Sequence, residues 1–260
     1  MVDGTRHAFV TGASSGIGRA ASTVLLESGY MVTAIDRSKP ALNGVTWIQH
    51  DLNDMSSDVP SLPAPVDVLV NAAGLPPRVG TEAMVLRVNF LALRRLTETI
   101  IDDMAPGARI VNVASKAGAK WHENLPQVER FLALPDDREL EQFVRDESID
   151  AVRSYDLSKE AVIVWTKAMT APLLELGLRM NAVSPGAVET PILPDFVDAF
   201  GARALKGIEM TKGTGQASDI AKVIAFLASP DSHWLRGCNI DSDGGLTAML
   251  EAEKTISWRP

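Results

Sequence analysis

Short runs of β-branched and apolar residues alternate along the chain with longer segments in which apolar residues recur at helical spacing. The short runs predict strands at residues 7–10, 31–35, 45–49, 67–70, 109–113, 179–183 and 238–241. The helical spacing predicts helices at residues 16–27, 81–104, 155–176 and 218–227. Strands that alternate with helices pair in parallel and are covered on both faces. The pattern therefore predicts an α/β protein with a doubly wound parallel sheet, formed as one domain over residues 1–260.

Two segments depart from this regular alternation. Three prolines, Pro60, Pro63 and Pro65, stand before strand 67–70, so we expect at most a short helix in that connection. Residues 118–151 form an insert whose apolar spacing predicts two short helices, joined at residues 135–137. Within the insert, residues 121–150 hold nine acidic residues and three arginines, which predicts that one of its faces is solvated.

Composition limits the classes of partner. The formal net charge of -8 argues against a nucleic-acid partner, because phosphates require clustered Lys and Arg. The apolar runs are shorter than the roughly 20 residues of a membrane helix, and residues 1–7 lack the apolar core of a signal peptide. The one cysteine, Cys238, forms no internal disulfide, and the four histidines show no ligand spacing. We expect a cytoplasmic protein without a metal, a nucleic-acid partner or a membrane partner.

The first predicted strand leads into a loop with three glycines, and a predicted helix follows at once. Glycines let the backbone turn tightly and approach a pyrophosphate, whose charge is favoured by a helix N-terminus. The spacing differs from the general G-x-G-x-x-G pattern, so a purely structural glycine turn is the alternative. The predicted dinucleotide contacts in this loop are Gly12, Ser14, Ser15, Gly16, Ile17 and Gly18.

The residue at the end of the second strand bears on the choice of cofactor. Asp36 follows Gly18 by eighteen residues, and its carboxylate can accept hydrogen bonds from the adenine ribose and repel a 2′-phosphate. Arg37 comes next and is the residue that could instead bind such a phosphate. The sequence therefore predicts NAD in preference to NADP; the alternative is that Asp36 is a solvated acid at a strand end.

Four polar side chains are candidates for the chemistry. Tyr155 and Lys159 lie one turn apart on the same helix face, so the ammonium can favour the phenolate. Ser115 follows the fifth strand, where doubly wound folds bind ligands, and its hydroxyl can bond to a substrate oxygen. Asn89 lies in the middle of a predicted helix. The alternatives are a tyrosine beside a snorkelling lysine, a turn serine and a buried amide that kinks its helix.

Together these motifs resemble the short-chain dehydrogenase/reductase family in its short, single-domain form. The resemblance extends over nearly the whole chain, through residues 11–18, 71–74, 89, 115, 155 and 159, 185–186 and 243–245. It implies a Rossmann-type fold and hydride transfer between NAD and an alcohol or carbonyl carbon. It implies that Tyr155 is the general acid/base and that Ser115 orients the carbonyl. Lys159 would hold the nicotinamide ribose and lower the pKa of Tyr155, and Asn89 would position a proton-relay water.

The same resemblance enlarges the set of cofactor contacts. Asp51 and Leu52 would flank the adenine, Thr190 would contact the carboxamide, and the small residues at 71–74 would allow close approach. Beyond the glycine loop, the predicted cofactor contacts are Asp36, Arg37, Asp51, Leu52, Asn71, Ala72, Ala73, Gly74, Tyr155, Lys159, Pro185, Gly186, Val188 and Thr190.

Within the family, the long insert and the shortened connection resemble two bacterial groups, the coniferyl-alcohol dehydrogenases and the 3α-hydroxysteroid dehydrogenases/carbonyl reductases. Residues 159–166 and 190–197 are most similar to the first group. The 39 residues between Ser115 and Tyr155 exceed the usual number in the family. They would obstruct the helix face through which many relatives form tetramers. We therefore expect a homo-oligomer, and a homodimer through the last predicted helix and strand in preference to a homotetramer.

The segment 187–215 corresponds to the lid that covers the substrate in this family. Its apolar residues predict a small-molecule hydrophobic alcohol or ketone, of aromatic, allylic, alicyclic or steroid-like type. Ordinary packing beneath the lid is the alternative, and Arg203 is one candidate for docking a carboxylate. The predicted substrate contacts are Trp121, Leu125, Ile192, Leu193, Phe196 and Met210.

Two rival functions use the same nucleotide site. A non-catalytic nucleotide sensor would keep the glycine loop and Asp36 but lose Tyr155 or Lys159, and both are present. A dehydratase or epimerase with bound NAD would usually show a larger C-terminal substrate region. Net appearance or loss of reduced cofactor with substrate separates a dehydrogenase from both.

Overall fold

The computed structural model describes residues 6–61 and 65–255. Its strands are β1 (Arg6–Thr11), β2 (Tyr30–Asp36), β3 (Val45–Gln49), β4 (Val66–Asn71), β5 (Met104–Val113), β6 (Arg179–Pro185), β7 (Val188–Glu189), β8 (Gly215–Gln216) and β9 (Asn239–Ser242). Its α-helices are α1 (Gly16–Glu27), α2 (Glu82–Leu86), α3 (Ala92–Ile100), α4 (Leu125–Leu132), α5 (Leu140–Asp146), α6 (Ala151–Ala168), α7 (Thr170–Glu175), α8 (Leu193–Phe200), α9 (Ala202–Met210), α10 (Ala217–Ala228) and α11 (Leu246–Thr255). A π-helical segment spans Arg87–Leu91, and short 3₁₀ helices span Ile101–Asp103, Lys116–Lys120 and Pro230–Ser232.

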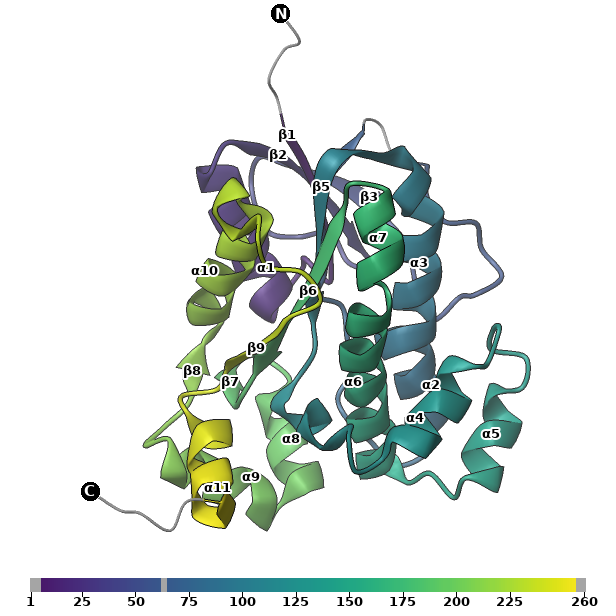
Figure 1. Ribbon diagram of the computed structural model, residues 1–260, viewed down its shortest axis with the longest axis vertical. Helices are drawn as coiled ribbons and strands as arrows, with labels where there is room; N and C mark the ends of the chain where they lie inside the picture. Colours follow the sequence, from purple (N-terminus) through teal and green to yellow (C-terminus); the bar gives the residue numbers. More distant parts are fainter. Residues whose placement is uncertain (1–5, 62–64, 256–260) are drawn as a thin grey trace, which may run out of the picture.

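The central sheet is parallel and has seven strands in the order β3-β2-β1-β4-β5-β6-β9. These are the seven strands that the sequence predicts. Helices α1 and α10 cover one face of the sheet, and α3, α6 and α7 cover the other (Figure 1). The doubly wound, Rossmann-type fold is therefore confirmed. The strand order reverses between β1 and β4, and in such sheets ligands bind at the carboxyl ends of the strands beside this point.

Two apolar cores lie on the two faces of the sheet because strand side chains alternate in direction. In β1, Phe9 belongs to the core beneath α3 and α6, whereas Ala8 and Val10 belong to the core beneath α1 and α10. Phe9 is fully buried, and a side chain of that size contributes roughly 2–3 kcal/mol by leaving water. Strands buried on both faces have continuous apolar runs, which is why the sequence locates them.

The helix predicted at residues 81–104 is wrong in its extent. It consists of α2, the π-helical segment and α3, and Met104 already belongs to β5, which is longer than the predicted strand 109–113. A π-helical turn places one extra residue in the helix and is frequent at functional sites. Here it carries Asn89.

The helix predicted at residues 155–176 is also divided. It begins four residues earlier, at Ala151, because the Asp150 side chain caps it by accepting a hydrogen bond from the Arg153 N–H at 2.7 Å. It ends at Ala168, because Pro172 has no N–H group that could donate a hydrogen bond to the Ala168 carbonyl. Helix α7 follows. The chemistry-bearing Tyr155 therefore lies in the second turn of α6.

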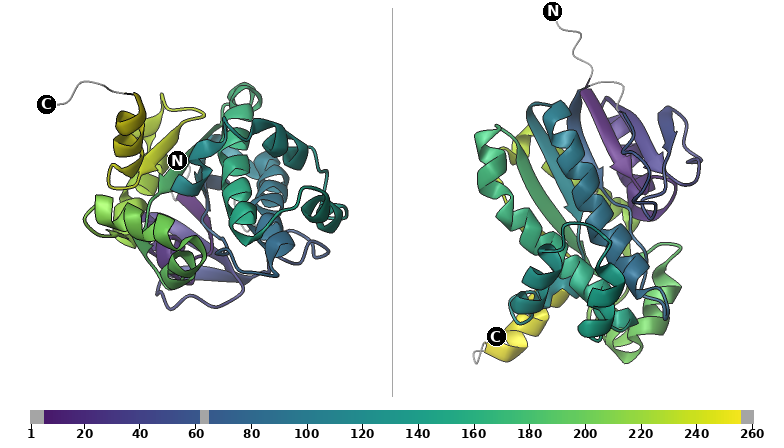
Figure 2. Two further views of the ribbon diagram at one scale, coloured as in Figure 1. Left: turned by 90° about the horizontal axis from the view of Figure 1, so that it is seen from below. Right: turned by 90° about the vertical axis from the view of Figure 1, so that its right-hand side faces the viewer.

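The insert contains α4 and α5, as predicted, and residues 50–61 contain no helix; Pro63 lies outside the described residues. Val128, Phe131, Leu140 and Phe143 of the insert are buried, while its acidic residues lie mostly on the exposed side. Figure 2 shows the insert, α8, α9 and α11 at the same end of the sheet. The sequence did not predict α8, α9 or α11 as helices.

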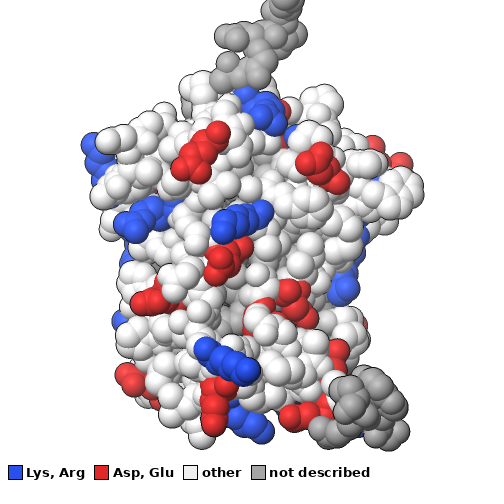
Figure 3. All heavy atoms as spheres, turned by 90° about the vertical axis from the view of Figure 1, so that its left-hand side faces the viewer, with Lys and Arg blue, Asp and Glu red and all other residues white. Residues whose placement is uncertain are grey.

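The exterior carries charged side chains of both signs. On the face seen in Figure 3, lysine and arginine side chains are interspersed with aspartate and glutamate. Among the helices of residues 6–61 and 65–255, none combines the length and the apolar character that a bilayer-spanning segment needs.

Candidate active site

A cleft of ≈ 1430 Å³ opens at the carboxyl ends of the central strands, beneath α8, α9 and α11. Its walls bring together most of the predicted site residues, from loops that are far apart in the sequence. The predicted residues that line it are Gly12, Ser14, Ser15, Gly16, Ile17, Gly18, Asp36, Arg37, Asp51, Leu52, Ala72, Ala73, Gly74, Ser115, Tyr155, Lys159, Pro185, Gly186, Val188, Thr190, Ile192, Leu193, Phe196 and Met210. Asn71, Asn89, Trp121 and Leu125 do not line it.

The glycine loop is held against the loop that follows β4. Gly12 has a φ of +69°, and a Cβ atom there would lie 2.7 Å from the Cα atom of Ala73, so only glycine fits. The Thr11 hydroxyl accepts hydrogen bonds from the N–H groups of Ala72 (3.0 Å) and Ala73 (3.1 Å). Thr11 is not among the predicted site residues, although the position of Thr11 at the end of β1 could have identified this residue from the sequence.

The N-terminus of α1 is suited to a pyrophosphate. Ser15 is its first flanking residue and makes no side-chain capping bond, and no acidic residue stands in the first turn. The first N–H groups of a helix lack partners within the helix and carry partial positive charge. Gly16, Ile17 and Gly18 of this first turn line the cleft, so the loop fits the phosphates of a dinucleotide.

Asp36 closes the far end of this part of the cleft. One carboxylate oxygen accepts a hydrogen bond from the Ser14 N–H at 3.0 Å, and the other accepts one from the Ser38 N–H at 2.9 Å. These bonds fix the carboxylate and leave further lone pairs for ribose hydroxyls. Asp51 and Leu52 line the same region.

Tyr155 and Ser115 share one end of the cleft. The Tyr155 side chain is buried, and burial raises the pKa of its phenol above the ordinary value. A hydrogen bond with the Ser115 side chain lowers that pKa, and the Asp156 carboxylate raises it. Burial is the largest of these effects, so the phenol is protonated at neutral pH. The lowering of this pKa by Lys159 together with a bound oxidised nicotinamide stays a prediction for the cofactor-bound enzyme.

Lys159 lies one turn beyond Tyr155 and is only 4% exposed. Its Nζ atom donates a hydrogen bond to the Val113 carbonyl at 2.9 Å and lies 5.7 Å from the centroid of the Tyr155 ring. Burial lowers the pKa of Lys159 to about 8. The ammonium is thus held between the end of β5 and the phenol, facing the cleft.

Asn89 and Asn71 do not line the cleft, but their side chains hold neighbouring segments in place. The Asn89 side chain accepts a hydrogen bond from the Leu75 N–H at 2.7 Å and donates to the Leu75 carbonyl and the Ser158 hydroxyl. The Asn71 amide donates to Thr97 and Asn112. Both amides are buried, so their side chains position the residues 71–75 and do not themselves reach the cavity.

The lid presents apolar groups to the phenol. The ring centroids of Phe196 and Phe200 lie 4.9 Å and 6.1 Å from that of Tyr155, in edge-on arrangements. No residue within α8 or α9 is fully buried, although Ile192, Leu193, Phe196, Phe200 and Met210 line the cleft. The apolar side chains of the lid therefore remain available to a hydrophobic ligand.

Trp121 and Leu125 are corrections to the predicted substrate contacts. Trp121 stacks on His122, with ring centroids 3.3 Å apart, and packs against the core beneath α6. Leu125 begins α4, which packs against α6. The insert thus turns these two residues away from the cleft.

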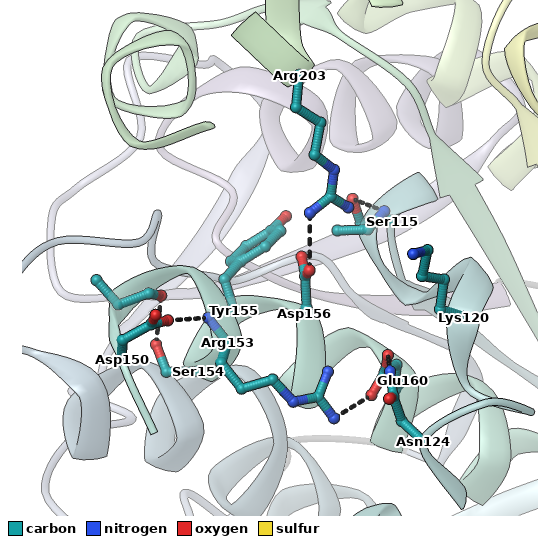
Figure 4. A network of polar contacts seen from close by, with 12 residues as sticks. Ser115, Lys120, Asn124, Asp150, Arg153, Ser154, Tyr155, Asp156, Glu160 and Arg203 are labelled. Carbon is teal, nitrogen blue, oxygen red and sulfur yellow. Dashed lines mark hydrogen bonds and ion pairs between the residues drawn. The ribbon is translucent and has the colours of Figure 1, made fainter. Parts of the chain in front are cut away.

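Two ion pairs that the sequence did not predict connect the lid to the body of the protein. Arg78, in the loop after β4, donates from two nitrogens to the two carboxylate oxygens of Asp195, each at 2.9 Å. Arg203 of α9 donates to the Asp156 carboxylate at 2.8 Å (Figure 4). Among the described residues, no group of three or more His, Cys, Asp or Glu side chains is arranged to hold a metal ion.

Comparisons with known proteins agree with this geometry. Residues 6–126 match the family model described as short chain dehydrogenase, and residues 142–247 match the model described as Enoyl-(Acyl carrier protein) reductase. Coniferyl-alcohol dehydrogenase of Pseudomonas sp. (strain HR199) is 34% identical over 244 residues, which cover 92% of this chain and 95% of that protein. The 3-alpha-hydroxysteroid dehydrogenase/carbonyl reductase of Comamonas testosteroni is 26% identical over 93% of this chain and 96% of its own length.

A solved structure shows the same fold over nearly the whole chain. The 3-alpha-hydroxysteroid dehydrogenase from Pseudomonas sp. B-0831, in complex with NADH, superposes with a TM-score of 0.76 at 26% identity. The match covers 95% of this chain and 99% of that one. With the sequence matches and the cleft described above, it leads to one conclusion: the chain is an oxidoreductase that belongs to the short-chain dehydrogenase/reductase family.

Proposed function

We propose that the protein oxidises a hydrophobic aromatic or allylic alcohol to its carbonyl compound with NAD, and catalyses the reverse reduction, in the manner of a coniferyl-alcohol dehydrogenase. The observation that carries the proposal is the convergence of Tyr155, Ser115 and Lys159 at one end of a cleft whose lid is apolar. The 34% identity to the Pseudomonas coniferyl-alcohol dehydrogenase supports this substrate class.

NAD is the proposed cofactor. The open N-terminus of α1 and the glycine that touches Ala73 fit its pyrophosphate, and the fixed Asp36 carboxylate fits the adenine ribose while repelling a 2′-phosphate. The presence of NADH in the structurally similar Pseudomonas enzyme supports the same choice. Lys159, at the other end, would hold the nicotinamide ribose.

The proposed mechanism assigns the proton to Tyr155. NAD, when bound, supplies the hydride acceptor and a positive charge that favours the phenolate. The Ser115 oxygen accepts a hydrogen bond from the Ala117 N–H at 3.1 Å, and its hydroxyl also bonds to the Tyr155 phenol. A substrate oxygen placed between the two side chains would receive the Ser115 hydrogen in place of the phenol. In reduction, the protonated phenol donates its proton to the carbonyl oxygen; in oxidation, the phenolate accepts the proton of the alcohol. Lys159 stabilises the phenolate by its charge.

A steroid-like alicyclic alcohol is the second candidate substrate. The cleft of ≈ 1430 Å³ exceeds the volume of common small-ligand pockets, about 300–1,000 Å³, so a bulky substrate could share it with a cofactor. The similarity to two 3-alpha-hydroxysteroid dehydrogenases supports this alternative.

A substrate panel tests the proposal. Coniferyl alcohol, a 3α-hydroxysteroid and small polyols are incubated with NAD or NADP, and the reduced cofactor is followed by absorbance, with Ser115→Ala as the matched inactive control. Turnover of coniferyl alcohol with NAD supports the proposal, and turnover of the steroid alone selects the second candidate. Turnover confined to polyols contradicts the apolar cleft. Cofactor binding without turnover indicates a nucleotide sensor, and product formation without net cofactor reduction indicates a dehydratase or epimerase.

The proposal includes a cytoplasmic location and a homodimer in preference to a homotetramer. The insert packs α4 against α6 and α5 against α2, which obstructs that side of the molecule. Light scattering coupled to size-exclusion chromatography measures the mass, and a stable tetramer contradicts the dimer.

A further inference from the structure

We propose that Asp156 makes the cleft selective for uncharged substrates by neutralising Arg203, the guanidinium that the lid places beside the catalytic phenol. This inference rests on the proposed function, since it concerns the substrate of the same site. It assigns a specificity role to a pair of residues that take no part in the hydride transfer.

Arg203 brings a guanidinium from the lid to the cleft. This residue belongs to α9 and lines the cleft, and its Cζ atom lies 4.7 Å from the centroid of the Phe200 ring. That ring lies 6.1 Å from the ring of Tyr155. Figure 4 shows the Arg203 side chain extending from the lid toward α6, on the side where Tyr155 and Ser115 lie. A guanidinium in this place can bind a carboxylate through two parallel hydrogen bonds.

Asp156 supplies the carboxylate that binds Arg203. It follows Tyr155 on α6, its side chain is 16% exposed, and it accepts the hydrogen bond of Arg203 at 2.8 Å. Its other oxygen is buried and has no hydrogen-bond partner among the described residues. A carboxylate this buried needs a charged partner. The lid supplies that partner, so Arg203 is occupied and the pair carries no net charge.

Near this pair, Lys116 follows Ser115 and lines the cleft, and the carboxylates of Asp241 and Asp243 act on its ammonium. To bind Arg203, an acidic substrate would have to displace Asp156. The Asp156 carboxylate also raises the pKa of Tyr155, which disfavours the phenolate. An acid at this position does not assist proton transfer. It does assist the exclusion of acidic substrates.

The test compares an acidic ligand with its neutral amide of nearly the same shape, 4-carboxycinnamyl alcohol and 4-carbamoylcinnamyl alcohol. Their dissociation constants are measured by calorimetry on the NADH-loaded enzyme, which cannot oxidise an alcohol, and their kcat/KM values with NAD by cofactor absorbance. Asp156→Asn keeps the size of the side chain and frees Arg203, and Asp156→Ala is the second variant. Relative to the neutral ligand, we expect about tenfold tighter binding of the acidic one in either variant that folds, which corresponds to about 1.4 kcal/mol.

Two controls isolate the role of Arg203. The double variant Asp156→Asn/Arg203→Gln lacks both charges and should lose the gain. Asp136→Asn removes the same charge from an exposed pair with Arg138 on the insert and should leave the ratio as in the wild type. A ratio in the Asp156 variants within twofold of wild type, or an equal gain in the double variant, overturns the inference. Absence of turnover of both alcohols by the wild type refutes the proposed function instead, and the dissociation constants still decide the inference.

Discussion

Replacing Lys159 by Met tests the burial of the ammonium independently of catalysis. Lys159 is 4% exposed, its hydrogen bond goes to the Val113 carbonyl, and burial lowers its pKa from 10.5 to about 8. Between these two values the unfolded chain retains the proton that the folded chain releases. The stability of the wild-type protein should therefore rise, through this group, as the pH rises through that window.

The magnitude follows from the same two pKa values. Over the whole titration of Lys159, the free energy of unfolding increases by about 3.4 kcal/mol. About 2.5 kcal/mol of this increase falls between pH 7 and pH 10. Loss of the hydrogen bond to Val113 adds a contribution that does not depend on pH, so it cancels when the difference between wild type and Lys159→Met is compared at two pH values. Other titrating groups are common to both proteins and cancel to first order.

The assay is urea unfolding of both proteins from pH 7 to pH 10. The free energy of unfolding of the wild type should increase relative to the variant by roughly 2–3 kcal/mol. Lys167→Met removes an exposed ammonium from the same helix and is the control. A wild-type-minus-variant difference that stays constant over this range would refute the argument that burial perturbs Lys159.

Three further predictions concern the cleft. Tyr155→Phe should lower kcat by about 10²–10⁴-fold while leaving NAD affinity, measured by fluorescence titration, nearly unchanged; retained turnover would require another acid. Asp36→Asn should reduce the preference for NAD over NADP, expressed as a ratio of kcat/KM values, by about tenfold through loss of charge repulsion; an unchanged ratio would contradict its role. Gly12→Ala places a Cβ atom 2.7 Å from the backbone of Ala73 at a positive φ and should destabilise the fold by about 1–3 kcal/mol in urea unfolding; wild-type stability would show that the two loops can separate freely.

The sheet and the glycine loop could be predicted from the sequence because their signals are local. Strands buried on two faces contain short apolar runs, such as residues 8–10 in β1 and 68–70 in β4, and the glycine loop leads directly from β1 into α1. The lid helices could not be predicted in this way. Helix α8 contains no buried residue, and its Asp195 is held by Arg78, which is 117 residues away in the sequence. Such a helix depends on a partner that no local pattern reveals.

The surroundings of Asn89 and Tyr155 could not be predicted from the sequence, for a common physical reason. The π-helical turn satisfies the Asn89 amide with the backbone of Leu75, a contact between two segments that the sequence does not show to be neighbours. Burial is the largest effect on the pKa of Tyr155. Sequence spacing gives the distance along a helix between two charged groups, but it does not give their burial.

The polar residues of the insert attach it to the helix that carries the catalytic pair. Glu160 is fully buried, and it accepts hydrogen bonds from Arg153 of the same helix and from Asn124 of the insert, each at 2.6 Å. Arg153 also donates to Gln127 of α4 at 2.7 Å. The insert is therefore not only a solvated acidic surface. Its amide side chains belong to a network with Arg153 and Glu160 that fixes α6 against the insert (Figure 4).

The order of residues 155–160 follows from these two attachments. Tyr155 and Lys159 are four apart and face the cleft, while Asp156 and Glu160 are also four apart and lie about 100° around the same helix. Asp156 binds the lid and Glu160 binds the insert. One helix face thus carries the proposed catalytic pair, and the neighbouring face holds that helix between two segments. A motif search that records only the tyrosine and the lysine therefore misses the acids that set where both side chains stand.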